Sequence, residues 1–290
     1  MANKMKLELE HSKLKPAIHN GLAMTECYEP LADHLEKVKA MQLRNDDVLL
    51  CSFPKSGTHW MYRVIDMLQR GSTQYYDRNA DSTFLDAQLI ERLSELASPR
   101  VLVTHLPFDH LPQQVKDKRT KIVHVYRNPR AVLVSFYHMM KTFKLNTPEY
   151  SETTLDKTAD LFFSDNMVYY GWFGHLDNMS AYQAQNPSVP IFHISYEEMT
   201  LSPVDTVKKL AEFLGKTVTP EFCAQVVEAC SFKKQKESEE TLDQSQAALT
   251  FYRKGDMNDW KNHLTVAHNE KFAKVLKERA EKCPFSAKYT

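Results

Sequence analysis

Short apolar runs alternate along the chain with longer segments whose apolar residues recur at helical spacing. A parallel strand buried on both faces reads as a continuous apolar run, and DVLLCSF at residues 47–53 has this form before Pro54 interrupts it. Three similar runs predict strands at residues 101–104, 121–126 and 191–195. One helical pattern begins at about residue 58. Further helical patterns cover residues 129–144, 159–184, 203–214, 220–229 and 267–282.

This alternation predicts an α/β fold with a central parallel sheet that helices flank on both faces. The first strand and its helix enclose a short loop of the kind that binds phosphate. No internal repeat or linker rich in Pro, Ser and Gly divides the 290 residues. A single domain spanning residues 1–290 is therefore expected.

Composition excludes several classes of function. Lys plus Arg total 37 and Asp plus Glu total 37, so no net positive charge attracts nucleic acid or an anionic membrane surface. Residues 1–13 lack the apolar core of a signal peptide, and no apolar run is long enough to span a membrane. The 5 cysteines are odd in number and include no closely spaced pair, which argues against a disulfide framework and a zinc site. A cytoplasmic protein is expected.

The turn after the first strand, Pro54-Lys55-Ser56-Gly57-Thr58, has the features of an anion site. Backbone N–H groups at a helix N-terminus favour phosphate, Gly57 permits close approach, and Lys55 adds a cation. A plain turn with a solvated lysine is an equally good interpretation of this tract alone. The nucleoside-triphosphatase loop is a poorer match, because Lys55 precedes Ser-Gly-Thr instead of following a glycine.

Three segments together resemble the cytosolic sulfotransferases, which use 3′-phosphoadenosine 5′-phosphosulfate (PAPS) and release adenosine 3′,5′-bisphosphate (PAP). SFPKSGTHW at residues 52–60 resembles the family's 5′-phosphosulfate loop. VYRNPR at residues 125–130, with Ser135, resembles its 3′-phosphate segment. RKG at residues 253–255, followed by DWK at residues 259–261, resembles its C-terminal cofactor segment. The match covers nearly the whole chain.

The resemblance implies a set of PAPS-binding residues. Arg127 and Arg253 suit two separated phosphate groups, because a guanidinium grips phosphate oxygens in a bidentate manner. Ser135 is expected to donate to the 3′-phosphate, although a hydrogen bond to its own helix is the ordinary alternative. Trp60, Tyr196 and Phe232 are expected beside adenine, with core packing as their alternative. The full predicted set is Lys55, Ser56, Gly57, Thr58, His59, Trp60, Arg127, Ser135, Tyr196, Cys230, Phe232, Arg253, Lys254 and Gly255.

The family chemistry is sulfuryl transfer to a hydroxyl or amine by in-line displacement. His105 follows an apolar strand, where an imidazole can accept the acceptor's proton, and the resemblance makes it the general base. A single histidine among 12 is otherwise more often structural. Lys55 would stabilise the departing bridging oxygen, and Ser135 would steer Lys55 before the acceptor binds. No metal is implied.

The acceptor is left open among phenols, catecholamines, sterols and other natural products. An apolar pocket would suit a small, mostly lipophilic molecule. Candidate wall residues, each with core packing as the alternative, are Phe108, Met139, Phe143 and Trp172.

The chain departs from the family pattern at four positions. Cys230 stands where the family usually has a small hydroxyl residue near adenine, and Val103 stands where many members have a lysine. Ala131 replaces a frequent aspartate, and Asn258 replaces the usual glycine. Asn258 is expected to preserve a left-handed turn, because asparagine tolerates that backbone better than most residues.

Two other function classes compete with this interpretation. A nucleotide kinase or triphosphatase fits poorly, because the loop pattern differs and no obvious aspartate would hold a metal. A catalytically silent nucleotide-binding module is disfavoured by the joint presence of Lys55, His105 and Ser135.

Two further expectations concern the last third of the chain. Lys261, Thr265, Val266 and Glu270 match the short dimer motif of the cytosolic sulfotransferases, which predicts a weak homodimer. An ordinary loop leading into the final helix is the alternative. Residues 233–248 are polar and predict a mobile loop that orders over a ligand.

Overall fold

A computed structural model describes residues 16–25, 29–75, 78–143, 153–235, 237, 253–281 and 283–290. Its central sheet is parallel, with strand order β4-β3-β5-β6. The strands are β3 (Val48–Ser52), β4 (Val101–Thr104), β5 (Lys121–Tyr126) and β6 (Ile191–Ser195). All four predicted strands are therefore confirmed, as is the α/β class.

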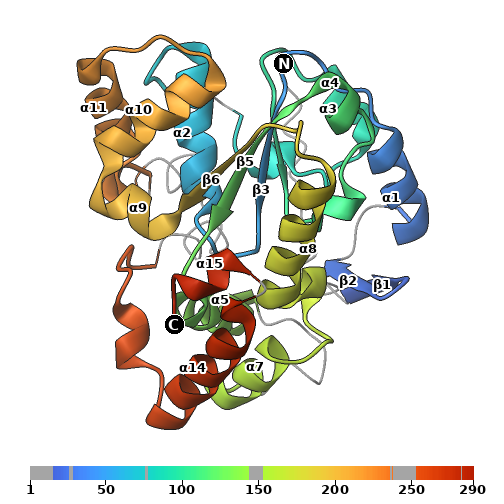
Figure 1. The fold of residues 1–290 in the computed structure, drawn as a ribbon. Helices are drawn as coiled ribbons and strands as arrows, with labels where there is room; N and C mark the ends of the chain where they lie inside the picture. Colours follow the sequence, from blue (N-terminus) through green and yellow to red (C-terminus); the bar gives the residue numbers. More distant parts are fainter. Residues whose placement is uncertain are drawn as a thin grey trace.

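Helices cover both faces of this sheet (Figure 1). One face carries α2 (Thr58–Arg70), α9 (Tyr196–Leu201), α10 (Pro203–Leu214) and α11 (Pro220–Ala229). The other carries α1 (Leu31–Ala40), α3 (Ile90–Glu95), α4 (Gln114–Lys118) and α8 (Gly171–Gln185). Strand β3 supplies both layers, since Val48 and Leu50 join the first core while Leu49 and Cys51 join the second. This double burial is why its sequence is continuously apolar.

A third group of helices gathers at one end of the sheet (Figure 1). It consists of α5 (Pro129–Phe143), α7 (Leu155–Phe162), α14 (Val266–Ala280) and α15 (Pro284–Ala287). Helix α5 contacts α7, and α14 contacts α15. Among the described residues, no helix combines the length and apolar character needed to cross a bilayer.

The predicted helix at residues 159–184 is wrong, because the chain forms α7 and α8 with a break between them. The turn η3 (Val168–Tyr170) lies in that break. Tyr169 and Tyr170 have φ of 56° and 65°, and Gly171 follows at 67°. Left-handed backbone cannot continue a right-handed helix. Apolar residues continue at helical spacing through the break, so periodicity alone did not reveal it.

Several short elements were not anticipated. A hairpin of β1 (Pro16–His19) and β2 (Leu22–Thr25) turns at Asn20-Gly21, a dipeptide typical of such turns. Three other 3₁₀ turns are η1 (Asp81–Thr83), η2 (Phe108–His110) and η4 (Asp259–Asn262). Strand β2 contacts η3, so the hairpin packs against the strained Tyr169 segment.

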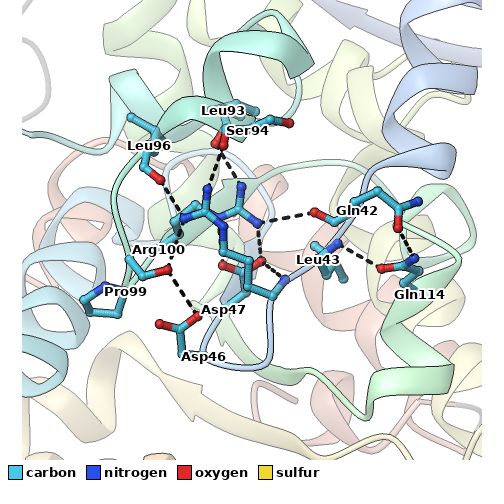
Figure 2. A network of polar contacts seen from close by, with 12 residues as sticks. Gln42, Leu43, Asp46, Asp47, Leu93, Ser94, Leu96, Pro99, Arg100 and Gln114 are labelled. Carbon is cyan, nitrogen blue, oxygen red and sulfur yellow. Dashed lines mark hydrogen bonds and ion pairs between the residues drawn. The ribbon is translucent and has the colours of Figure 1, made fainter.

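A buried ion pair fixes the amino ends of β3 and β4 (Figure 2). Arg100 donates to Asp47 from Nε to Oδ1 at 2.8 Å and from Nη2 to Oδ2 at 2.5 Å. Arg100 also donates to the Leu93 carbonyl at 2.9 Å, and the Arg44 peptide N–H donates to Asp47 at 2.7 Å. The pair thus joins the two strands at the end opposite the loops that follow Ser52 and Thr104.

Candidate active site

The loop between β3 and α2 has a backbone that only particular residues allow. Lys55 has φ of 68°, and Gly57, which precedes α2, has φ of 102°. A Cβ on Gly57 would lie 2.8 Å from Cδ2 of Tyr196, so no side chain fits there. Ser52 Oγ lies 2.8 Å from Thr58 Oγ1 and ties the strand to the helix. The positive end of α2 therefore faces this loop.

Arg127, just after β5, joins the same loop. Its Nη1 donates to the Lys55 carbonyl at 3.1 Å, and its Cζ lies 4.2 Å from the centroid of the Tyr196 ring. The indole Nε1 of Trp172 donates to the Arg127 carbonyl at 3.1 Å. The Nε of Arg127 and the hydroxyl of Ser56 are buried and have no hydrogen-bond partner among the described residues. Donors in this state suit an anion that the loop is built to receive.

Positive charges around Lys55 alter its ionisation. Burial first, and then the charges of Arg127 and Arg253, lower the pKa of Lys55 to about 7. The three cations therefore repel one another at close range, which favours binding of a polyanion.

The backbone that carries Arg127 is held from the C-terminal segment. The hydroxyl of Tyr289 donates to Glu197 Oε2 at 2.8 Å, and Glu197 Oε1 accepts from the Asn128 peptide N–H at 3.0 Å. Arg130 donates to the Tyr289 carbonyl at 3.0 Å. Sequence reasoning missed this support, because residues 92 positions apart form its central hydrogen bond.

Aromatic side chains from three distant segments meet beside the loop. The rings of Trp60 and Tyr196 pack edge to face, with centroids 5.3 Å apart, and the Tyr196 hydroxyl donates to the Gly255 carbonyl at 3.3 Å. A Cβ on Gly255, where φ is 71°, would lie 2.7 Å from Cδ2 of Phe232. The structure thus brings the predicted adenine-binding aromatics together around two glycines.

Cys230 lies deeper than the other members of the predicted set. Its side chain is fully buried, and its Sγ lies 3.5 Å from the sulfur of Met67. The thiol therefore points into the core, and the role of Cys230 in cofactor binding stays a prediction.

His105 follows β4 and is held in one tautomer. Its Nδ1 donates to the Ser52 carbonyl at 2.6 Å, so Nε2 carries the lone pair. Burial lowers the pKa of His105 to about 3, although the hydrogen bond to Ser52 opposes this. Its ring centroid lies 4.9 Å from that of Phe84 and 5.6 Å from that of Tyr169. The neutral imidazole thus presents a proton acceptor within an aromatic enclosure.

Asp86 anchors the backbone at His105 and was missed by sequence reasoning. Its carboxylate accepts from the Thr104 hydroxyl at 2.5 Å and from the His105 peptide N–H at 2.8 Å. Burial raises the pKa of Asp86 to about 6, against these two hydrogen bonds. No motif signalled this role, because an isolated acidic residue carries no spacing pattern.

The remaining predicted site residues occupy three settings. His59 Nε2 lies 3.0 Å from Asp81 Oδ1, and Ser135 is half-buried on α5. Arg253 and Lys254 both bond to Asp259. The roles of His59 in cofactor binding and of Ser135 in steering Lys55 stay predictions. Among the described residues, no cluster of three or more His, Cys, Asp or Glu side chains is arranged to bind a metal.

Two of the expected acceptor-wall residues pack in the core. Phe108 and Trp172 are both 0% exposed, and their role in an acceptor pocket stays a prediction. Met139 is partly buried against the same core. The side chain of Phe143 lies outside the described residues, as do residues 236 and 238–248 of the predicted mobile loop.

The departures from the family pattern also have clear positions. Val103 is fully buried in β4 and Ala131 is buried on α5. Asn258 has φ of −104°, so the expected left-handed turn is wrong. This backbone conformation does not require asparagine or glycine.

Comparisons with known proteins show similarity in both sequence and fold. A family profile described as the sulfotransferase domain matches residues 45–284. Sulfotransferase 1A1 of mouse is 32% identical, covering 88% of this chain and 91% of its own, and the rat protein is 32% identical with 93% and 96% covered. The crystal structure of mouse sulfotransferase SULT7A1 complexed with PAP superposes with a TM-score of 0.74 and 28% identity, covering 94% of this chain and 97% of that one.

Proposed function

Because the chain belongs to the sulfotransferase family and transfers a sulfuryl group from PAPS, we propose that His105 is its general base and that the acceptor is small and mostly lipophilic. The observation that carries the proposal is the hydrogen bond from His105 Nδ1 to the Ser52 carbonyl. Ser52 ends β3, the strand that leads into the loop assigned to PAPS. The hydrogen bond therefore holds the imidazole, with its unprotonated Nε2, next to that loop.

The described residues fit PAPS. Two buried donors without partners, Ser56 Oγ and Arg127 Nε, match an anion with several acceptor oxygens. Gly57 and Gly255 let the backbone approach the Tyr196 and Phe232 rings, which a Cβ at either position would meet at 2.8 Å and 2.7 Å. We assign residues 55–60 to the 5′ end of PAPS, Arg127 and Ser135 to its 3′-phosphate, and Trp60, Tyr196 and Phe232 to adenine. PAPS supplies a sulfuryl group joined to a phosphate leaving group.

The proposed mechanism is a single displacement. His105 accepts the acceptor's proton at Nε2, and the Nδ1–H bond to Ser52 stabilises the imidazolium that forms. Lys55, protonated beside the phosphate groups, stabilises charge on the departing bridging oxygen. Because the sulfuryl group passes to the acceptor in one step, the mechanism has no covalent enzyme intermediate. Most of the rate acceleration comes from positioning and electrostatics.

The enclosure around His105 supports a lipophilic acceptor. Phe84 is 9% exposed and Tyr169 is 3% exposed, and both rings flank the imidazole. Aromatic walls of this kind favour flat apolar molecules that carry a hydroxyl, such as phenols. We also propose a cytoplasmic location, because the four described cysteines are free and buried.

Nucleotide preference distinguishes this proposal from a kinase or triphosphatase. We expect PAP to raise the melting temperature far more than ATP with magnesium does, because the site has cations for two separated phosphates and no metal cluster among the described residues.

Arg253→Ala should weaken PAPS binding by about 1.5–3 kcal/mol through loss of a charge-assisted hydrogen bond.

The matched control for this comparison is Arg92→Ala, which removes an exposed arginine on α3. Its PAPS affinity should stay at the wild-type value. Stabilisation dominated by ATP and magnesium, or unchanged affinity in Arg253→Ala, would contradict the assignment.

We further propose a weak homodimer through Lys261, Thr265, Val266 and Glu270. All four are exposed, and Val266 is 75% exposed at the first position of α14. Two such segments about a two-fold axis would pack the Val266 side chains together and place each Lys261 near the partner's Glu270. Thr265 caps α14 by accepting from the His268 N–H, which fixes the segment's shape.

The dimer should dissociate on dilution, because a segment this short buries less than the roughly 1,000 Å² of a stable interface. Light scattering across a concentration series should show the wild type approaching a dimer and Val266→Glu remaining a monomer. Val204→Glu, which changes a valine 37% exposed on α10, should behave as the wild type. A wild-type protein that stays monomeric at high concentration would remove the proposal.

A further inference from the structure

A buried carboxylate lies among the cations of the C-terminal cofactor segment. Asp259 is only 3% exposed, at the start of η4. Its Oδ1 accepts from Lys254 Nζ at 2.8 Å, and its Oδ2 accepts from Arg253 Nη2. Asn262 and His263 complete its surroundings, at 3.4 Å and 3.0 Å. A buried negative charge is unusual in a segment that is assigned to bind an anion.

The carboxylate stays ionised in this position. Burial raises the pKa of Asp259, but hydrogen bonds from Lys254 and Arg253 outweigh that effect and hold the pKa below its ordinary range. Asp259 therefore partly cancels the charge of two groups assigned to bind phosphate. By Coulomb's law alone, it should weaken the binding of any anion nearby.

The same carboxylate lies where the segment meets α5. Its neighbour His263 packs edge-on against His138 of α5, with ring centroids 5.2 Å apart. Trp260 packs against Arg130 of α5, whose Cζ lies 5.5 Å from the indole centroid. Helix α5 also carries Ser135, one turn before His138. Asp259 thus connects the C-terminal cations to the helix that supports the 3′-phosphate site.

We propose that Asp259 is a positioning residue that strengthens PAPS binding by holding Arg253 and Lys254 in place against α5. This inference rests on the proposed assignment of Arg253 and Lys254 to the cofactor. Long basic side chains lose rotamer freedom when they grip a phosphate, and that loss is smaller when they are already held. Preorganisation then outweighs the unfavourable charge of the carboxylate.

The two effects predict opposite outcomes for Asp259→Asn. If positioning dominates, calorimetry should show PAP binding weakened by about tenfold, while kcat at saturating PAPS stays within about threefold of the wild type. If the charge dominates, PAP should bind tighter. Equal or tighter binding overturns the inference, whereas a wild-type protein that does not bind PAP overturns the proposed function instead.

Asp256→Asn is the matched control for charge. Asp256 lies three residues earlier in the same segment, is exposed, and accepts only from the Asn258 N–H at 2.8 Å among the described residues. The substitution removes the same charge without touching Arg253 or Lys254, so PAP affinity should not fall. A loss equal to that of Asp259→Asn would show that positioning by Asp259 is not the cause.

Two further variants separate positioning from general stability. In an Arg253→Ala background, Asp259→Asn should reduce PAP affinity much less, because one of the two side chains that Asp259 holds is gone. If the two substitutions lower the binding free energy of PAP additively, the inference is wrong. If Asp259→Asn fails to fold, Asp259→Glu keeps the charge and displaces the carboxylate by one methylene. Weaker PAP binding by that variant supports positioning, and unchanged affinity overturns it.

Discussion

His105→Ala should lower turnover by about 10²–10⁴-fold, the usual contribution of a general base, while leaving PAP affinity near the wild-type value. The imidazole is the proton acceptor in the proposed mechanism, and its Nδ1 bond to Ser52 keeps Nε2 unprotonated. Burial lowers the pKa of His105 to about 3, so the ring is neutral at neutral pH and Nε2 carries a lone pair. Single-turnover kinetics with several acceptors would measure the loss.

Two variants control for structure in that experiment. His105→Asn keeps a donor for the Ser52 carbonyl but supplies no basic nitrogen, so it should be nearly as inactive as His105→Ala. His19→Ala changes a histidine that ends β1 and bonds to Asn20 in the hairpin turn, and it should retain full turnover. Near-wild-type turnover of His105→Ala with every acceptor would show that another group removes the proton.

Lys55→Met should lower turnover by about 10²–10³-fold, because it removes the cation that stabilises the departing oxygen. It should also change the pH dependence of PAP binding. The pKa of Lys55 is about 7 because burial and the charges of Arg127 and Arg253 lower it. Phosphate nearby raises that pKa, so binding takes up a proton and wild-type affinity should fall as pH rises above about 7.

Calorimetry in buffers of different ionisation enthalpy would measure this proton uptake. The Lys55→Met variant should show none from this group, and its PAP affinity should be flat over the same pH interval. Lys116→Met, which alters an exposed lysine on α4, should retain the wild-type slope. Proton uptake that is identical in Lys55→Met and wild type would contradict the assignment.

The sheet and the glycine turn before α2 were predictable because their signals are local. Strands β3 and β4 are buried along their whole length, which leaves a continuous apolar run in the sequence of each. In the loop before α2, the left-handed backbone and the nearby Tyr196 ring require glycine at position 57. A requirement of this kind leaves a visible mark in a short stretch of sequence.

The supporting network was not predictable, because its partners are far apart in sequence. Asp86 holds the peptide of His105 across 19 positions, and Tyr289 reaches Glu197 across 92 positions. Asp259 lies within a recognised segment, but no pattern in that segment indicates that it bonds to Arg253 and Lys254. Contacts of this kind depend on the finished fold, so spacing along the chain does not reveal them.

Backbone strain explains the largest error in the predicted elements. Tyr169 and Tyr170, immediately before α8, adopt left-handed conformations that bulky side chains rarely take, and no α-helix can run through them. The same strained turn places the Tyr169 ring beside His105. Strain of this kind tends to occur at functional sites, where surrounding contacts maintain it.

The most direct test of the central claim is transfer of label from radiolabelled PAPS to a panel of phenols, sterols, catecholamines and sugars. We expect at least one lipophilic hydroxyl compound to gain label in an amount equal to the PAP released, and His105→Ala to transfer almost none. Binding of PAP without transfer to any acceptor would contradict the account and indicate a nucleotide-binding module instead.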